Sequence, residues 1–174
     1  MENSKSTQPE LPLEIERKFL IRFPDLNWLD RVADRSQITQ TYLLDEKGVS
    51  ARVRKREWPD RCVYTHTRKQ KITLRRRVEQ EREITLEEYQ LLLEQADPKR
   101  SPLFKTRYCL PYCGQLLEID VFPFWKKQAF LEIELDEEDA EVIIPPQLSV
   151  LREVSDDKHY TNAALAKRIP SEEA

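Results

Sequence analysis

Charged side chains fall on alternate positions in seven segments of this sequence. Residues spaced in this way share one face of a β-strand, because successive side chains of a strand point to opposite sides. Clustered Arg and Lys side chains offer hydrogen-bond donors to an anion with many oxygens, such as a polyphosphate. Clustered carboxylates repel one another and favour a hard, oxygen-ligated cation such as Mg²⁺ or Mn²⁺. The segments carry Glu14, Glu16 and Lys18; Arg52, Arg54 and Arg56; Lys69; Arg75, Arg77, Glu79, Glu81 and Glu83; Lys105 and Arg107; Glu118 and Asp120; and Glu132 and Glu134.

These charged faces allow two arrangements of the strands. If the charges face solvent, as in a half-exposed antiparallel sheet, the apolar faces must pack together as a sandwich. A closed barrel instead places the charges around a hydrated interior and leaves the apolar faces to be covered by helices. The charged faces carry almost no Ser, Thr, Asn or Gln, which favours the barrel. A lattice of ion pairs without any ligand is the remaining alternative, although interior ion pairs are costly to desolvate.

Period-two patterns predict the strands, and helical spacing predicts a few short helices. The strands are expected at 13–22, 37–44, 49–57, 61–70, 73–85, 103–110, 115–122 and 129–135, and helices at 24–34, 86–96 and 160–168. Short connections between strands are typical of hairpins rather than of βαβ units. We therefore expect an α+β, mainly β fold, an eight-stranded antiparallel closed β-barrel with short helices packed outside. It would form a single domain over residues 11–170, between a disordered tail at 1–10 and a tail at 171–174.

The composition argues against several classes of protein. The 29 Lys and Arg residues nearly balance the 32 Asp and Glu residues, and the net charge of −3 gives no global attraction to nucleic acid or to an anionic membrane. No stretch approaches the roughly 20 apolar residues of a spanning helix, and the first residues do not have the pattern of a secretory signal. The cysteines, Cys62, Cys109 and Cys113, fit a reducing compartment. We expect a cytoplasmic monomer or homodimer that binds neither nucleic acid nor a membrane.

Nine segments of the chain, taken in order, resemble a known family. They are residues 14–20, 40–43, 52–54, 67–69, 77–81, 105–108, 117–122, 131–134 and 157–162. The first segment, with Glu14, Glu16 and Lys18, is similar to the Glu-x-Glu-x-Lys signature of the CYTH domain, the domain of the triphosphate tunnel metalloenzymes. One such motif is weakly specific. Nine segments in the family's order across the whole predicted domain are highly specific.

The resemblance implies a tunnel in which bases bind triphosphate and carboxylates hold a divalent metal. The implied phosphate contacts are Lys18, Arg52, Arg54, Lys69, Lys105 and Arg107, with Lys158 closing one end. The implied metal ligands, direct or through water, are Glu14, Glu16, Glu81, Glu132 and Glu134, supported by Glu79, Glu118 and Asp120. Lys69 lies beside the family's central phosphate position and is a candidate catalytic residue. Tyr42 is the other, because it matches a tyrosine near the leaving phosphate in some bacterial members, although a tyrosine packed in the core is the alternative.

Two positions depart from the family pattern. Ser50 stands where related bacterial members often carry a glutamate. The connection from Lys69 to Arg77 lacks a glycine that is often found there, which leaves the register of the next strand open. Either the pair Glu79 and Glu81 or a pair displaced by two residues, Glu81 and Glu83, would then reach the site.

The family includes inorganic triphosphatases, thiamine triphosphatases, class IV adenylyl cyclases and, more distantly, RNA triphosphatases. The segments 14–20 and 117–122 are most similar to the bacterial inorganic triphosphatases. We expect a hydrolase dependent on Mg²⁺ or Mn²⁺ that cleaves inorganic triphosphate to pyrophosphate and phosphate. The alternatives are a nucleoside or thiamine triphosphatase, an adenylyl cyclase, and a polyphosphate-binding module without activity. Trp58 and Trp125 are candidates to stack on a ring, although such residues more often pack at the rim of a barrel.

Overall fold

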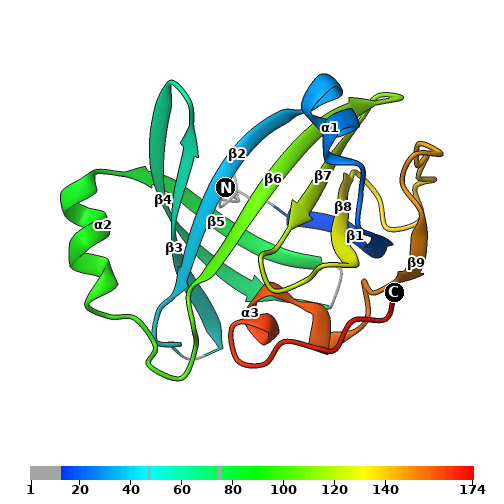
Figure 1. Cartoon of the computed structure of the whole chain (residues 1–174). Helices are drawn as coiled ribbons and strands as arrows, with labels where there is room; N and C mark the ends of the chain where they lie inside the picture. Colours follow the sequence, from blue (N-terminus) through cyan, green and yellow to red (C-terminus); the bar gives the residue numbers. More distant parts are fainter. Residues whose placement is uncertain (1–12, 47, 74–75) are drawn as a thin grey trace, which may run out of the picture.

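The computed structural model describes residues 13–46, 48–73 and 76–174 (Figure 1). The predicted tail at 1–10 and Arg75 lie outside the described residues. The strands are β1 (Leu13–Arg22), β2 (Asp34–Tyr42), β3 (Val49–Trp58), β4 (Arg61–Lys71), β5 (Arg76–Ile84), β6 (Leu103–Tyr112), β7 (Gln115–Val121), β8 (Gln128–Leu135) and β9 (Val150–Glu153). The helices are α1 (Leu26–Val32), α2 (Leu86–Leu93), the short 3₁₀ turn η1 (Lys158–Tyr160) and α3 (Asn162–Leu165).

The strands form one antiparallel sheet that closes on itself. Their order is β5-β4-β3-β2-β6-β7-β8-β1-β9, and a further pairing of β5 with β1 completes a barrel of eight strands. Strand β1 makes this closure with its first residues, Leu13–Ile15, and pairs with β9 through Phe19–Ile21. The predicted closed barrel is therefore confirmed, and β9 is an additional strand beside it.

Local sequence signals set the turns and the helix starts. Cys113 and Gly114 connect β6 to β7 and both have positive φ, 51° and 74°, as a two-residue hairpin turn of type I′ requires. Thr85 begins α2 with a capping box, because its side chain accepts from the Glu88 amide and the Glu88 side chain accepts from the Thr85 amide. Asp25 caps α1 in a similar way.

Apolar residues cover the outside of the barrel in two clusters. One lies over β1 and β6–β8, contains Leu117, Ile119, Leu131 and Ile133, and is covered by α1 through Leu29. The other lies between α2 and the strands β3 to β5. These are the apolar faces that the sequence pattern assigned to the outside, so the charged faces of the same strands line the interior.

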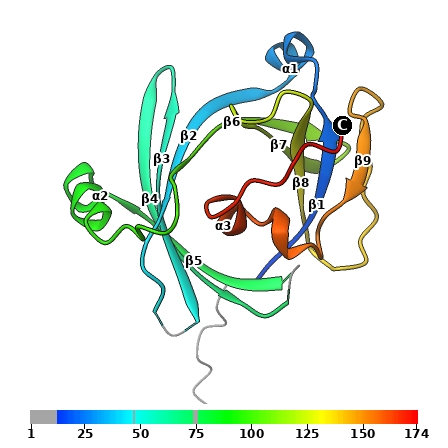
Figure 2. The ribbon, with the colours of Figure 1, turned by 60° about the horizontal axis from the view of Figure 1, so that its bottom comes forward.

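The charged lining ends in a third cluster, which is aromatic. Leu20, Phe122 and Phe130 continue the same strand faces as Lys18, Asp120 and Glu132, and they pack with Trp125, Tyr160 and Leu165. Tyr160 and Leu165 belong to the η1–α3 segment, which lies across one end of the barrel (Figure 2). This end of the barrel is therefore filled by apolar side chains.

Most element boundaries lie within a few residues of the prediction, with two differences near the site. Strand β4 continues beyond Lys69 to Lys71. Residues 171–174 contact the barrel, since the Glu173 carboxylate accepts hydrogen bonds from Arg152 and Tyr160.

Candidate anion and metal site in the barrel

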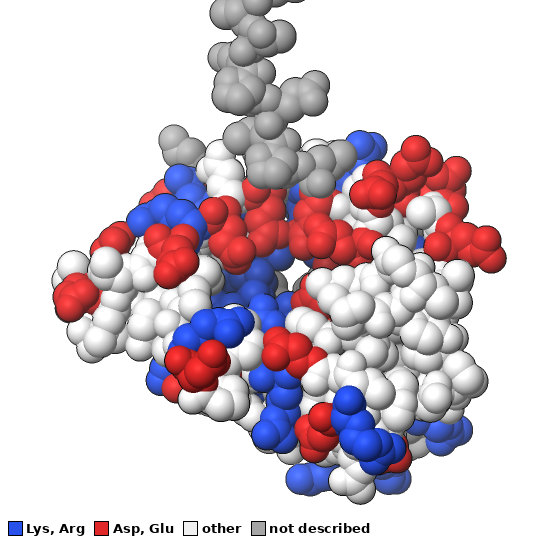
Figure 3. Space-filling model, turned by 90° about the horizontal axis from the view of Figure 1, so that it is seen from above, with Lys and Arg blue, Asp and Glu red and all other residues white. Residues whose placement is uncertain are grey.

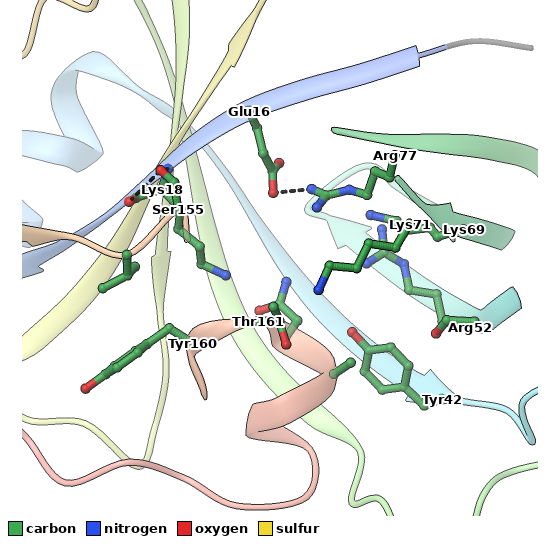
Figure 4. Close-up of a pocket in the computed structure, with 14 residues that line it drawn as sticks. Glu16, Lys18, Tyr42, Arg52, Lys69, Lys71, Arg77, Ser155, Tyr160 and Thr161 are labelled. Carbon is green, nitrogen blue, oxygen red and sulfur yellow. Dashed lines mark hydrogen bonds and ion pairs between the residues drawn. The ribbon is translucent and has the colours of Figure 1, made fainter. Parts of the chain in front are cut away.

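A cavity of about 200 Å³ lies between the barrel wall and the η1–α3 segment. Strands β1 to β5 supply its charged wall, and residues 154–163 supply its opposite side. Figure 4 shows the cationic ends of Lys71, Lys69 and Arg52 directed toward this space, with Lys18 on the other side. Its lining is Glu16, Lys18, Tyr42, Ser50, Arg52, Lys69, Lys71, Arg77, Val154, Ser155, Tyr160, Thr161, Asn162 and Ala163.

Two bases of this lining, Lys69 and Arg52, are only loosely neutralised. Lys69 lies 3.3 Å from Glu79 and 3.7 Å from Glu14, and Arg52 lies 3.8 Å from Glu79. The buried Nε of Arg52 has no hydrogen-bond partner among the described residues. Burial, together with the neighbouring Arg52 and Arg77, lowers the pKa of Lys69 to about 8. An anion in the cavity would supply the missing partners, because buried polar groups are rarely left unpaired.

Lys105 and Arg107 have closer partners. Lys105 lies 2.7 Å from Asp120, and Arg107 donates two hydrogen bonds of 2.8 Å to the same carboxylate. Arg107 also pairs with Glu118. Burial disfavours the charged form of Asp120, but Arg107 and Lys105 outweigh that effect and lower its pKa. Neither base lines the cavity, so the structure separates them from the bases around Lys69.

Arg54 lies between these two groups of bases. It donates to the Gln40 side chain at 2.9 Å, while its buried Nε has no hydrogen-bond partner among the described residues. Burial and the neighbouring Arg52 and Arg107 lower its pKa to about 9. A nearby anion would favour its charged form, because it would offset both the burial and the repulsion by Arg52 and Arg107.

The carboxylates gather on β7, β8 and β1. Glu16 stands directly opposite Glu134, and Glu118 directly opposite Glu132. Like charges at such positions destabilise a sheet unless something neutralises them. Burial and the charges of Glu14 and Glu118 raise the pKa of Glu134. Seen from above, Asp and Glu side chains gather along one side of a hollow, and Lys and Arg side chains lie within it (Figure 3).

This donor set suits Mg²⁺ or Mn²⁺ in its chemistry, since it consists of carboxylate oxygens that repel one another. Glu14, Glu16, Glu132 and Glu134 would hold such a cation. Among the residues that the structure describes, no three potential ligands are already gathered as a metal site requires. The carboxylates are paired with bases instead, as Glu132 is with Lys18 at 3.2 Å.

The carboxylates of strand β5 lie at different distances from the cavity and from the carboxylates of β1 and β8. Glu79 stands opposite Lys69 and contacts it, whereas Glu81 stands opposite Thr67 and accepts its hydrogen bond at 2.9 Å. Glu83 stands opposite Thr65, further from the closure of the barrel. Glu79 is thus the β5 carboxylate nearest the cavity, and Glu81 lies apart from the carboxylates of β1 and β8.

Tyr42 lies where the cavity and the core meet. It lines the cavity, yet it is 5% exposed and packs in the aromatic cluster. Its hydroxyl accepts a hydrogen bond of 2.8 Å from Gln40. The structure leaves Lys158 exposed on η1, outside the cavity lining.

Sequence reasoning missed several residues of the lining. Lys71 follows Lys69 on the same strand face, so the period-two pattern could have identified it. The same pattern did place Arg77 on the charged face of its strand, but the resemblance gave it no role in the site. Ser155 precedes η1, and Thr161 and Asn162 lie at the start of α3, so strand alternation does not apply to these three residues. Ser50, noted as a departure from the family, does line the cavity.

The closed antiparallel barrel with this charged interior defines a class of protein, and comparison with known proteins identifies it. The chain is 38% identical over 163 residues to an inorganic triphosphatase of Nitrosomonas europaea, covering 90% of this chain and 99% of that protein. The chain therefore belongs to the CYTH family of triphosphate tunnel proteins, and within it resembles the inorganic triphosphatases.

Solved structures agree with this assignment. A crystal structure of an inorganic triphosphatase is 32% identical, with a TM-score of 0.58, and the match covers 91% of this chain and 97% of that one. A protein from Pyrococcus horikoshii, 22% identical with a TM-score of 0.55 over 72% of this chain and 80% of its own, shares the fold. No protein-family model matches the chain. Within the described part of the chain, every helix is too short or too polar to cross a membrane.

Proposed function

We propose that this protein hydrolyses inorganic triphosphate to pyrophosphate and phosphate, with Mg²⁺ or Mn²⁺ as its cofactor. The observation that carries the proposal is the cavity, where Lys18, Arg52, Lys69, Lys71 and Arg77 surround one space beside a group of carboxylates. An anion with many oxygens fits this arrangement of donors. The identity to an inorganic triphosphatase along almost its whole length supports that substrate.

The bases are expected to divide their work. Arg52 presents a fork of donors from a buried position and should hold the substrate in both its ground and transition states. Lys69 has two long ion pairs, with Glu14 and Glu79, and lies among other bases, so we assign it the stabilisation of charge that develops during phosphoryl transfer. A divalent cation held by the carboxylates would neutralise phosphate oxygens and activate water. Tyr42 lies at the wall, where its hydroxyl can contact a phosphate.

Lys105, Arg107 and Arg54 are proposed to act on the substrate from a second layer. Asp120 already accepts hydrogen bonds from Lys105 and Arg107, so they contribute positive potential rather than free donors. We expect direct phosphate contacts from these residues only if the substrate reaches past Arg52. The kinetic constants of variants at these positions test whether they contact a phosphate directly or act through their potential alone.

The two tryptophans considered as ring-stacking residues lie outside the cavity lining. Trp125 is 2% exposed, and its ring packs edge-on against Phe122 and Phe130. The Trp58 ring lies at the far end of β3 beneath Arg56 and Arg61. Neither lines the cavity, which favours inorganic triphosphate over a nucleotide or thiamine triphosphate.

The test is a steady-state comparison of inorganic triphosphate, ATP and thiamine triphosphate with Mg²⁺ and with Mn²⁺. We expect the highest kcat/KM for inorganic triphosphate and complete loss of turnover in excess chelator, restored by either metal. Cyclic AMP formation from ATP would support the cyclase alternative. Tight binding of triphosphate without turnover under every metal condition would reduce the protein to a binding module.

A further inference from the structure

Arg77 occupies a position between two of the proposed metal ligands. Its Nε donates to Glu14 at 3.0 Å, and its Nη2 pairs with Glu16, as the dashed line in Figure 4 shows. Arg77 and Glu14 are directly opposite one another where β5 and β1 close the barrel, so the strand register builds this contact. The Arg77 side chain is 18% exposed.

Arg77 is therefore a positive charge that the protein itself supplies to the acidic group. Glu16 also faces Glu134 across the β1–β8 pair, and its carboxylate is repelled by Glu132. A divalent cation bound there would use the carboxylate oxygens that Arg77 now contacts. Two positive groups at the same oxygens repel each other, so Arg77 and the cation compete.

The same side chain also lines the cavity that we assign to triphosphate. Lys69, Lys71 and Arg52 face that space from the neighbouring strands (Figure 4). A guanidinium released by Glu14 and Glu16 would find phosphate oxygens, its other preferred partners, within the same cavity. The cost of breaking its ion pairs would then be offset only when anion and cation are both present.

We propose that Arg77 is an exchangeable counter-ion, which neutralises Glu14 and Glu16 in the free protein and moves to the triphosphate when a divalent cation replaces it. The exchange rests on the proposed function and couples the two ligands, so that each favours the binding of the other. Free protein binds the cation weakly for this reason, and unproductive binding of metal or substrate alone is disfavoured.

The first test measures Mn²⁺ binding by calorimetry without any phosphate compound. Arg77→Gln should bind Mn²⁺ at least about fivefold more tightly than the wild type, the lower end of typical coupling between sites. Arg56→Gln is the matched control, because it removes one barrel arginine whose Nε donates to Ser36 rather than to a carboxylate. It should leave Mn²⁺ affinity unchanged.

Weaker or equal Mn²⁺ affinity in Arg77→Gln, or the same gain in Arg56→Gln, would overturn the exchange. Thermal melting establishes that each variant is folded. If Arg77→Gln is not folded, Arg77→Lys replaces it, since its shorter cation keeps a charge but cannot reach both carboxylates as the guanidinium does. Its Mn²⁺ affinity should exceed that of the wild type, and an equal or lower affinity contradicts the proposal.

The second test repeats the titration with an unhydrolysable triphosphate analogue. The analogue should tighten Mn²⁺ binding in the wild type, and should do so by a smaller factor in Arg77→Gln. An equal factor in the two proteins would overturn the transfer of Arg77 to the phosphate. An analogue that fails to bind the wild type with any metal would instead contradict the proposed function, and the first test would still decide whether Arg77 competes with the cation.

Discussion

The two sides of the barrel interior use similar residues in different ways. On β6 and β7, Lys105 and Arg107 hold Asp120 through contacts of 2.7 and 2.8 Å, and neither Lys105 nor Asp120 is exposed. On β3 and β4, Arg52 and Lys69 reach their carboxylates at 3.3 to 3.8 Å beside a cavity. In the first group, both bases already donate hydrogen bonds to Asp120. In the second group, the Arg52 Nε has no hydrogen-bond partner among the described residues.

This difference shows that a charged residue on the inner face is not by itself a ligand contact. Under the proposed function, the saturated ion cluster fixes the wall and sets the local potential, and the loosely paired cluster is the one expected to bind the substrate. The sequence alternation is the same in both, so only the distances and partners distinguish them. Variants in the two clusters should therefore change different properties of the protein.

The largest expected effect is a loss of stability in Asp120→Asn. The change leaves Lys105 and Arg107 buried with much of their neutralising charge removed, and breaking a buried pair in this way typically costs about 3–5 kcal/mol. Urea denaturation measures the free energy of unfolding. Glu79→Gln in the looser cluster is the control, with an expected loss of about 1 kcal/mol or less. Similar losses in the two variants would remove the distinction between the clusters.

The second effect concerns turnover rather than stability. Lys69→Ala should lower kcat at least about a hundredfold, or about 2.7 kcal/mol, the typical loss for one preorganised electrostatic contact. Arg52→Ala should act mainly on KM, because Arg52 holds the substrate in its ground and transition states alike. Arg54→Ala should also act mainly on KM, through the positive potential that Arg54 adds from the second layer. Steady-state kinetics at saturating metal gives both constants. An unchanged kcat with a raised KM in Lys69→Ala would make it one more residue that only holds the substrate.

The sequence predicted the barrel well because its signal is repeated along the chain. Period-two charge on strand after strand, with Leu117, Ile119, Leu131 and Ile133 on the opposite faces, requires two different environments for each strand. The short β9 was missed, since its four residues follow an irregular region and gain their pairing only from β1. Its stability comes from tertiary contacts that no local pattern records.

The site was predicted in part for the same reason. Alternation places Lys18, Arg52 and Lys69 on the inner face, and the structure finds them around the cavity. The same alternation also places Lys105 and Arg107 on the inner face, but it cannot show that Asp120 already accepts their hydrogen bonds. Which bases remain available depends on the positions of side chains across strands distant in sequence.

The third prediction compares two neighbouring carboxylates of β8. Glu132→Gln removes the partner of buried Lys18 and should lower the free energy of unfolding by about 1–2 kcal/mol. Glu134→Gln should leave it unchanged or raise it slightly, because burial and repulsion by Glu14 and Glu118 disfavour its charge. Denaturation in the presence of chelator keeps metal from masking the difference.

The pH dependence of the free energy of unfolding tests whether the charge of Glu134 destabilises the folded protein. Its pKa in the folded protein is raised above the ordinary 4.5, so its favourable contribution is present below that pH and is lost as pH rises through the folded value. Any stability gained by Glu134→Gln should therefore be found at neutral pH and disappear in acid. A gain that persists at low pH, or a loss at neutral pH equal to that of Glu132→Gln, would contradict the assignment.

The smallest expected effect belongs to Lys71, the exposed base at the edge of the cavity. An exposed charge attracts an anion without fixing its orientation, and such contributions are typically below about 1 kcal/mol. Lys71→Ala should therefore raise KM by a factor of up to about five and leave kcat unchanged. Because the screening length falls to about 3 Å at 1 M salt, the difference from the wild type should vanish as salt is added. Lys55→Ala is the control, since Lys55 pairs with Glu57 on the other face of β3. A KM effect of Lys71→Ala that survives high salt, or a fall in kcat, would place Lys71 with Lys69 among the bases that contact the reacting phosphate.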